Sequence, residues 1–252
     1  MGNTTAAALR SSNENWIDLF GYGTSGWNNG YIDFMPYSYV NTPANYIAED
    51  LTGEYANADW GVYNSISGGG SQAGVWRTPT YDEWNYLLNE RTNAANLKSL
   101  ATIVKSYGEE YPGMIILPDD FQLPSECSGC EFNTGYAASH YAGFSTNEYT
   151  LEQWGYMEAA GAVFLPATGF RYSTSYYFGS YNYIGIYWTA TTYDDEYAYY
   201  MGFADAGSSS SSRAWISLNH SDSEAYIGYD YGNKVNGHAI RLVRNVLPSD
   251  ED

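Results

Sequence analysis

Apolar residues recur at helical spacing after Thr80, where the chain carries a signal for the start of a helix. Residues 80–83 read T-Y-D-E, a capping box in which Thr80 and Glu83 each satisfy a backbone amide of the other. The apolar side chains that follow fall on one helical face, and they are Tyr81, Trp84, Leu87 and Leu88. The pattern predicts a helix over residues 80–91.

A second helix is predicted after Thr150. It covers residues 151–160 and ends at Gly161, a residue that favours helix termination. Residues 94–105 carry a weaker helical pattern, and we expect a further helical stretch there.

Short apolar runs predict the strands. Residues 114–117 and 162–165 are each stopped by a proline, which is typical of buried strands. After Gly169, strand-like pieces alternate with segments rich in Tyr, Ser, Asn, Asp and Gly, and they cover residues 186–190, 199–203, 214–218 and 239–243. Alternation within these pieces predicts an antiparallel sheet with one packed face and one wet face. Two helices, short strands and long loops describe an α+β domain.

The length of 252 residues fits one large domain. We expect that domain over residues 16–247, with aromatic-rich loops and short strands over 16–75. Residues 1–15 are polar and are expected to be disordered or to derive from an expression vector, and residues 248–252 form an acidic tail. No stretch of 18 apolar residues occurs, so no membrane insertion is expected.

The charge and the tyrosine content indicate that this domain is a binding protein. The net charge is −19, from 29 acidic and 10 basic residues, and such a field disfavours nucleic acid and anionic membranes as partners. Tyrosine accounts for 28 residues, clustered in the C-terminal third. A tyrosine ring offers a large contact area at a low entropic cost and has a polar tip. The alternative is that β-rich, loop-rich folds use many aromatic residues for packing.

The residues that could support catalysis or bind metal do not have the spacing of a known catalytic or metal site. Cys127 and Cys130 lack the second cysteine pair or the histidines of a zinc site, so a loop disulfide or two free thiols is expected. His140, His220 and His238 have no triad or metal spacing and are expected on the surface or in loops. Neighbouring carboxylates occur at 119–120 and 194–196, but a glycosidase site needs two carboxylates that converge in a cleft, which a sequence does not show. The pair at 119–120 follows a strand and Pro118, so a cap or turn role is expected for it. We therefore predict no enzyme and no cofactor, with a structural calcium ion left open.

Four motifs together resemble one family. Residues 76–84 (W-R-T-P-T-Y-D-E-W) resemble the start of the first helix in C-type-lectin-like domains of the formylglycine-generating-enzyme type. Residues 161–171, 187–191 (Y-W-T-A-T) and 237–244 (G-H-A-I-R-L-V-R) are similar to segments of secreted paralogous proteins of gut Bacteroidetes and Fibrobacter. The likeness spans about residues 16–246. The enzymes of this type use cysteines near their closing strands, and this chain has none there, so their oxidase activity is not implied.

The resemblance implies a C-type-lectin-like fold, with two helices around small antiparallel sheets and long irregular loops. It also implies relatives that are diversified by retroelements, in which adenine-directed mutagenesis produces Tyr, Ser, Asp, His and Gly in a C-terminal variable region. Residues 170–236 have that composition and are the expected binding region. The candidate ligand-binding residues are Tyr172, Ser175, Tyr176, Tyr177, Tyr181, Tyr183, Tyr193, Asp194, Tyr197, Tyr200, His220, Asp222, Tyr226, Tyr229 and Tyr231.

Strand parity separates candidate site residues from candidate core residues. Tyr199, Met201 and Phe203 share one parity and are assigned to the core, so Tyr200 is assigned to the wet face. The other core candidates are Trp84, Trp188, Ile240 and Leu242.

The favoured function is a non-enzymatic module that presents a Tyr/Ser/Asp surface to a protein or glycan on a cell surface. This reading places the protein outside the cell, on the cell surface or on a phage particle. A secreted glycan-binding or glycan-degrading protein is one alternative, because tyrosine and tryptophan rings stack on sugars. A purely structural domain of a surface or phage protein is another.

Overall fold

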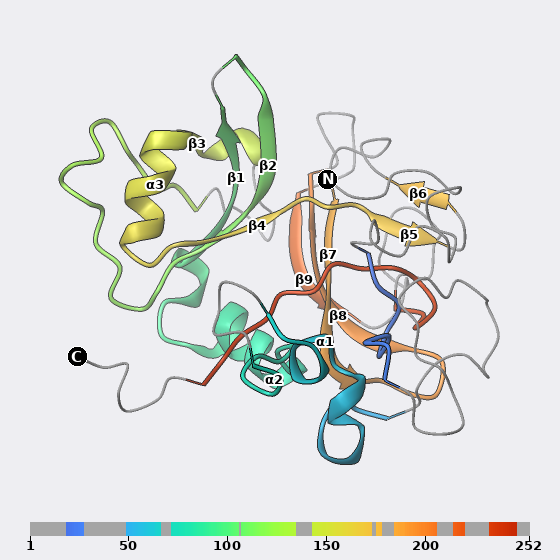
Figure 1. Cartoon of the computed structure of the whole chain (residues 1–252). Coiled ribbons are helices and arrows are strands. Elements are labelled where there is room, and N and C mark those ends of the chain that lie inside the picture. Colours follow the sequence, from blue (N-terminus) through green and yellow to red (C-terminus); the bar gives the residue numbers. More distant parts are fainter. Residues whose placement is uncertain are drawn as a thin grey trace.

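The protein is a mixed α+β molecule with few helices and small sheets, as the sequence predicts at that level (Figure 1). The computed structural model describes residues 19–27, 49–66, 72–105, 107–134, 143–172, 175–177, 184–205, 214–219 and 232–245. Two sheets lie side by side, and the helices lie around them. Within these ranges, no helix is long and apolar enough to cross a membrane.

The first sheet has the strand order β3-β1-β2-β4. Its strands are β1 (Lys98–Val104), β2 (Glu110–Ile116), β3 (Glu148–Thr150) and β4 (Val163–Pro166). Neighbouring strands run antiparallel except β1 and β3, which are parallel. The predicted buried strands at 114–117 and 162–165 are confirmed as the apolar ends of β2 and as β4.

Helix α3 (Leu151–Ala159) covers the outer face of this sheet (Figure 1). It begins with a second capping box, because the Thr150 side chain accepts a hydrogen bond from the Gln153 amide and the Gln153 side chain accepts one from the Thr150 amide. Trp154 and Met157 are buried beneath the helix in a core shared with β1 and β2. The helix predicted at 151–160 is confirmed.

The second sheet has the order β7-β8-β9, with β7 (Ile184–Thr192), β8 (Ala198–Ala204) and β9 (Trp215–Asn219). A separate hairpin is made of β5 (Phe170–Tyr172) and β6 (Ser175–Tyr177). The strands predicted at 186–190, 199–203 and 214–218 are confirmed within β7, β8 and β9.

Strands β7 and β8 of the second sheet are buried on both faces, so the expected wet face is wrong there. Met201 and Phe203 pack into the central core that also contains Trp84 and Leu100. The alternate residues of β7 and β8 pack against the N-terminal part of the chain, in a core that contains Tyr22, Leu51, Trp188 and Tyr200. Tyr200 is 0% exposed, which corrects its assignment to a solvent-exposed face.

The helix predicted at 80–91 begins as expected and then changes from an α-helix to a π-helix. Helix α2 (Tyr81–Asn85) starts with the predicted capping box between Thr80 and Glu83. It continues as the π-helical turn η4 (Tyr86–Glu90), in which the Arg91 amide donates to the Tyr86 carbonyl. The sequence did not indicate the short helices that precede it, η3 (Gly53–Ala58) and α1 (Trp60–Tyr63).

The helix predicted at 94–105 is wrong. Only the 3-10 turn η5 (Ala94–Asn96) is helical, and the chain then enters β1. The apolar spacing there suits a helix, but Thr102, Ile103 and Val104 are β-branched and pair on both sides, with β2 and with β3. Pairing with distant strands therefore decides the conformation of this segment.

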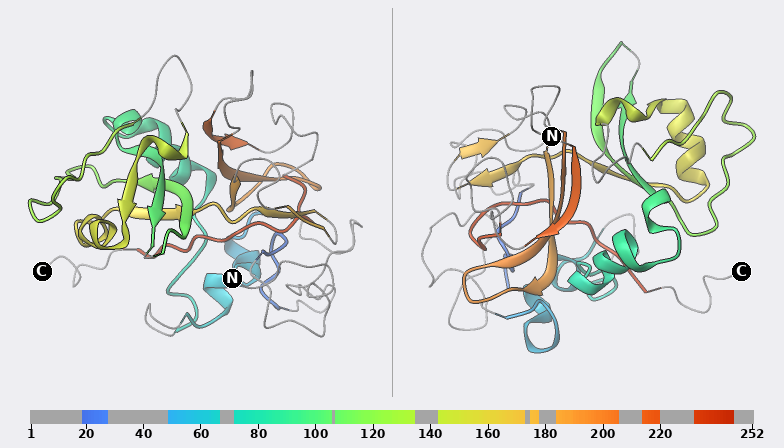
Figure 2. Two further views of the ribbon diagram at one scale, coloured as in Figure 1. Left: turned by 90° about the horizontal axis from the view of Figure 1, so that it is seen from above. Right: turned by 180° about the vertical axis from the view of Figure 1, so that it is seen from behind.

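The C-terminal segment, residues 232–245, connects distant parts of the fold (Figure 2). It forms isolated bridges and not the continuous strand expected at 239–243, with partners that include Phe20, Arg77, Arg171 and Tyr187. Trp84 and Trp188 are buried as predicted, whereas Ile240 and Leu242 are only half-buried.

Of the two alternatives for the cysteine pair, the structure has the loop disulfide, which joins Cys127 to Cys130. The bond lies in the loop between β2 and β3, beside α3. The Cys127 sulfur lies 3.5 Å from the Gln153 carbonyl of that helix.

Candidate functional site

The structure describes side chains for four of the predicted site residues, and they lie along β7 and β8. Tyr193, Asp194 and Tyr197 lie in the turn between these strands, and Tyr200 lies in the core. Tyr172, Ser175, Tyr176 and Tyr177 lie on the β5–β6 hairpin, of which the backbone is described. The remaining candidates lie outside the described residues, and they are Tyr181, Tyr183, His220, Asp222, Tyr226, Tyr229 and Tyr231.

The turn at residues 193–197 is held by a dense set of hydrogen bonds. The amides of Tyr193 and Asp194 donate to the Tyr197 carbonyl at 2.8 and 3.1 Å. The Asp194 carboxylate accepts in return from the amides of Glu196 (2.9 Å) and Tyr197 (2.8 Å). At the base of the turn, the Thr192 hydroxyl donates a hydrogen bond to the Asp194 carbonyl at 2.8 Å. One of the predicted ligand-binding groups, Asp194, thus also shapes its own loop.

Lys234 anchors the same turn from beneath. Its Nζ donates to the carbonyls of Asp194 (2.5 Å) and Asp195 (3.4 Å), and its amide donates to the Glu196 carbonyl (3.0 Å). The residue is 1% exposed, and burial lowers the pKa of its ammonium group to about 8, although nearby carboxylates raise it. Four carboxylates contribute, those of Asp194, Asp195, Glu49 and Asp50. The lysine therefore still carries its charge at neutral pH.

Three tyrosines gather where this turn meets the start of α2, and we call Tyr81, Tyr193 and Tyr199 the tyrosine platform. The ring centroids of Tyr81 and Tyr199 lie 4.4 Å apart, and those of Tyr193 and Tyr199 lie 5.5 Å apart, edge to face. Tyr193 is 47% exposed, and the other two are half-buried. The platform thus offers aromatic surface to solvent from two elements that are distant in sequence.

The position of Tyr81 follows from how α2 docks on the second sheet. The Ala190 amide of β7 donates to the Pro79 carbonyl at 2.8 Å. The Tyr81 amide donates to the Thr191 hydroxyl at 3.0 Å. The first turn of the helix is therefore fixed to β7, which brings Tyr81 against Tyr199 of β8.

Sequence reasoning missed two members of the platform. It placed Tyr199 in the core by strand parity and used Tyr81 only as an apolar helix position. No local signal indicates these two positions, because the rings of Tyr81 and Tyr199 meet only when the first turn of α2 packs against β7.

The platform is aromatic and surrounded by acidic groups. Partial burial raises the pKa of the Tyr199 hydroxyl, and Tyr81 and Tyr193 raise it further, so the hydroxyl stays protonated at neutral pH. Asp195 and Glu196 are exposed beside it. Such a surface can provide ring contacts, hydroxyl donors and carboxylate acceptors to a ligand. Among the described residues, no group of three His, Cys, Asp or Glu side chains is arranged to hold a metal ion.

His238 was expected on the surface or in a loop, and it lies outside the helices and named strands, but it is buried in the core and not on the surface. It is 0% exposed, and its ring stacks on Trp188 with centroids 3.9 Å apart. Neither ring nitrogen has a hydrogen-bond partner among the described residues. Burial, together with the charge of Arg171, lowers the pKa of His238 well below its usual value.

Comparison with known proteins adds no relative to this description. No protein-family model, no curated protein and no solved structure matches the chain.

Proposed function

We propose that the chain is a non-enzymatic ligand-binding module, in which the tyrosine platform and the adjoining tyrosine-rich segment contact a protein or glycan on a cell surface. The observation that carries the proposal is the ring cluster of Tyr81, Tyr193 and Tyr199 beside a turn that is held in one shape. Aromatic side chains dominate binding energy when they are presented in a fixed geometry.

The fixed geometry matters because ordering a loop on binding costs free energy. The turn at 193–197 is held by Asp194, Thr192 and Lys234 before any ligand arrives. Little further entropy is lost when Tyr193 and its neighbours meet a partner. The same anchoring supports the view that this region of the chain is built for recognition.

We further propose that the scaffold is C-type-lectin-like and that residues 170–236 are a retroelement-diversified region on a surface, secreted or phage-borne protein. The support is the set of four motifs and the Tyr/Ser/Asp composition of that region. Sequencing the surrounding locus tests this part. A near-identical template repeat and a reverse transcriptase gene are expected nearby, and a locus with neither contradicts it.

Substitution of Tyr193 by alanine tests the platform directly. The labelled protein is screened for binding to a panel of bacterial cells, and Tyr193→Ala is compared with wild type on the cells that bind. We expect a loss of about 2 kcal/mol, roughly 30-fold in Kd, because truncation of an aromatic anchor typically has that effect. The melting temperature should change little, since Tyr193 is 47% exposed and lies outside the buried cores.

Tyr156→Ala is the matched control, because Tyr156 is a similarly exposed tyrosine on α3, far from the platform. It should bind as wild type does. Equal losses for both variants, or no loss for Tyr193→Ala, would contradict a role for the platform.

A glycan ligand is favoured by one observation, the exposed Tyr193 ring beside the carboxylates of Asp195 and Glu196. Aromatic faces stack on sugar rings, and carboxylates accept hydrogen bonds from sugar hydroxyls. A glycan array probed with and without EDTA separates this case from a protein ligand. Binding that is lost with EDTA shows a calcium-dependent sugar site, and the absence of any array signal favours a protein partner.

A further inference from the structure

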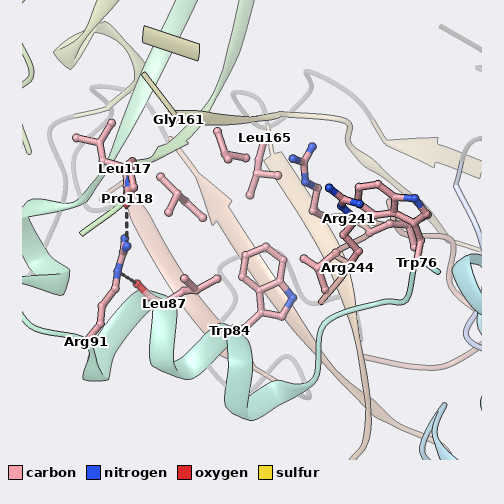
Figure 3. A pocket seen from close by; sticks show the side chains of 14 residues that line it. Trp76, Trp84, Leu87, Arg91, Leu117, Pro118, Gly161, Leu165, Arg241 and Arg244 are labelled. Carbon is pink, nitrogen blue, oxygen red and sulfur yellow. Dashed lines mark hydrogen bonds between the residues drawn. The ribbon is translucent and has the colours of Figure 1, made fainter. Parts of the chain in front are cut away.

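A pocket of about 370 Å³ lies between the α2–η4 helix, the first sheet and the C-terminal segment (Figure 3). The helix contributes Trp84 and Leu87, and the first sheet contributes Ile116 and Leu165. The C-terminal segment forms a further wall, which includes Leu242. The walls are mainly aliphatic, and the volume falls in the range of small-molecule sites.

The two ends of the pocket carry arginines with different roles. Arg91 closes one end (Figure 3), where its guanidinium donates to the Leu87 carbonyl at 2.8 Å and to the Leu117 carbonyl at 2.7 Å. Its side chain is 3% exposed and lies 3.2 Å from the Asp119 carboxylate, so it is part of the wall. Arg241 and Arg244 lie at the other end and are exposed.

The charge of this pocket is opposite to that of the whole protein. The chain has only 10 basic residues against 29 acidic ones, yet the 14 residues that line the pocket include three arginines and no Asp or Glu. The nearby Glu83 carboxylate is bound by Arg77 at 2.5 Å. Among the described residues, no carboxylate lies within ion-pairing distance of Arg241.

A further polar group in the wall lacks a partner. Trp84 is 2% exposed, and its indole Nε1 has no hydrogen-bond acceptor among the described residues. Trp76, at the end with the exposed arginines, has Arg244 over its ring at 5.9 Å. The pocket thus combines an aliphatic interior with N–H donors and positive charge, and it lacks acidic groups.

We propose that this pocket binds a small aliphatic carboxylate, with the hydrocarbon chain against the leucines and the carboxylate at Arg241 and Arg244. A cation is disfavoured because three arginines line the space. A neutral hydrocarbon makes no interaction with the Arg241 charge, whereas a carboxylate accepts charge-assisted hydrogen bonds from guanidinium groups. This site is separate from the tyrosine platform and does not depend on the function proposed for it.

The test compares three eight-carbon probes by isothermal titration calorimetry on the full chain. Octanoate, octanol and octylammonium share the same hydrocarbon body and differ in headgroup charge. We expect octanoate to bind at least about tenfold more tightly than octanol, as charge-assisted hydrogen bonds allow. Octylammonium should bind most weakly. The net charge of −19 favours the cation at any nonspecific site, so a preference for the anion must arise locally.

Variants then locate the binding. Arg241→Gln and Arg244→Gln should each weaken octanoate binding by about tenfold and leave octanol binding nearly unchanged. Leu87→Phe, which fills the pocket, should weaken both. Lys105→Gln is the matched control, because it removes one positive charge at the far end of the β1–β2 hairpin and should change nothing.

Several outcomes would overturn the proposal. These are the absence of octanoate binding, equal binding of the three probes, a preference for octylammonium, and an effect of Lys105→Gln as large as that of Arg241→Gln. Thermal melts of each variant show whether the fold is retained. Tyr193→Ala should leave octanoate binding unchanged, so failure of this proposal and failure of the platform proposal are distinguishable.

Discussion

His238 is buried in the core, although its neighbours in sequence suggest an exposed position. It follows a glycine in a segment without helix or continuous strand, yet its ring stacks on Trp188 and meets the edge of Tyr200. The Arg171 guanidinium is buried nearby at 2% exposure, and burial lowers its pKa to about 10. A protonated imidazole at this place would face both the loss of solvent and a like charge.

The pH dependence of stability should report this residue. The pKa of His238 is lowered in the folded state, whereas the unfolded chain titrates near the usual value of about 6.5. The unfolded state therefore binds a proton first as the pH falls below about 6.5. Folding stability should decrease in that range by up to about 1.4 kcal/mol per pH unit. Above that pH the contribution is fully present.

His238→Phe provides the comparison, since the ring stack is kept and the titrating group is removed. Urea unfolding between pH 7.5 and 5.5 should show a smaller loss of stability for the variant than for wild type. At pH 7.5 the variant should be about as stable, because both ring nitrogens lack partners among the described residues. Parallel pH curves for the two proteins would show that the histidine does not titrate in this way.

Tyr199 and Tyr200 show the limit of reading single residues from strand parity. The alternation on β8 was read correctly, in that the two tyrosines point to opposite faces. The expectation that the face of Tyr200 meets water is wrong, because the N-terminal part of the chain covers that face with Tyr22 and Leu51. Parity divides residues into two sets, but only tertiary packing decides which set is exposed.

At the scale of elements, substitution of two glycines by alanine should change stability in opposite directions. A Cβ on Gly185 in β7 would lie 2.2 Å from the ring of Phe203 on the paired strand. That ring is 0% exposed and packs against Phe144 and Tyr187, so it has no room to move. Gly155, in the middle of α3, has no atom within 4 Å of such a Cβ.

Gly185→Ala should therefore destabilise the protein by about 1–3 kcal/mol through overpacking. Gly155→Ala should stabilise it by about 0.5–1 kcal/mol, because alanine has the higher helix propensity. Chemical denaturation of both variants measures the two free energies of unfolding. The same sign of change for both would mean that close packing at Gly185 is not what separates them.

The elements that the sequence predicted well are those with a local cause. Both capping boxes lie within four consecutive residues, and both start helices where expected. Residues 98–104 were misjudged because their conformation depends on β2 and β3, which come later in the chain. Only one of the three platform residues, Tyr193, was predicted, for the same reason: Tyr81 and Tyr199 are 118 positions apart and meet only after α2 docks on β7.

The whole molecule is joined by its C-terminal segment. Three of its residues each exchange two backbone hydrogen bonds with a distant residue. The pairs are His238 with Phe20, Gly237 with Arg171, and Val243 with Arg77. The Ala239 carbonyl also accepts from the Trp188 amide of β7 at 3.1 Å. A segment with so many partners should be needed for cooperative folding.

A chain that ends at residue 231 should lose its cooperative thermal transition, because each of these partners would be left with exposed or unsatisfied backbone groups. A chain that ends at residue 245 keeps every one of these contacts and is the control, with a melting temperature close to that of the full chain. Differential scanning calorimetry of the two truncations makes the comparison. A sharp transition in the shorter chain would contradict this role.

The anchoring of the turn at 193–197 has a consequence for how this surface can change over time. Lys234 holds the turn through carbonyl oxygens of Asp194 and Asp195, and every amino acid supplies such an oxygen. Within the part of the chain that the structure describes, no hydrogen bond that holds the turn comes from the side chains of Asp195 or Glu196. The side chains at positions 195 and 196 can therefore be exchanged while the loop keeps its shape, so this turn can present different side chains without a new fold.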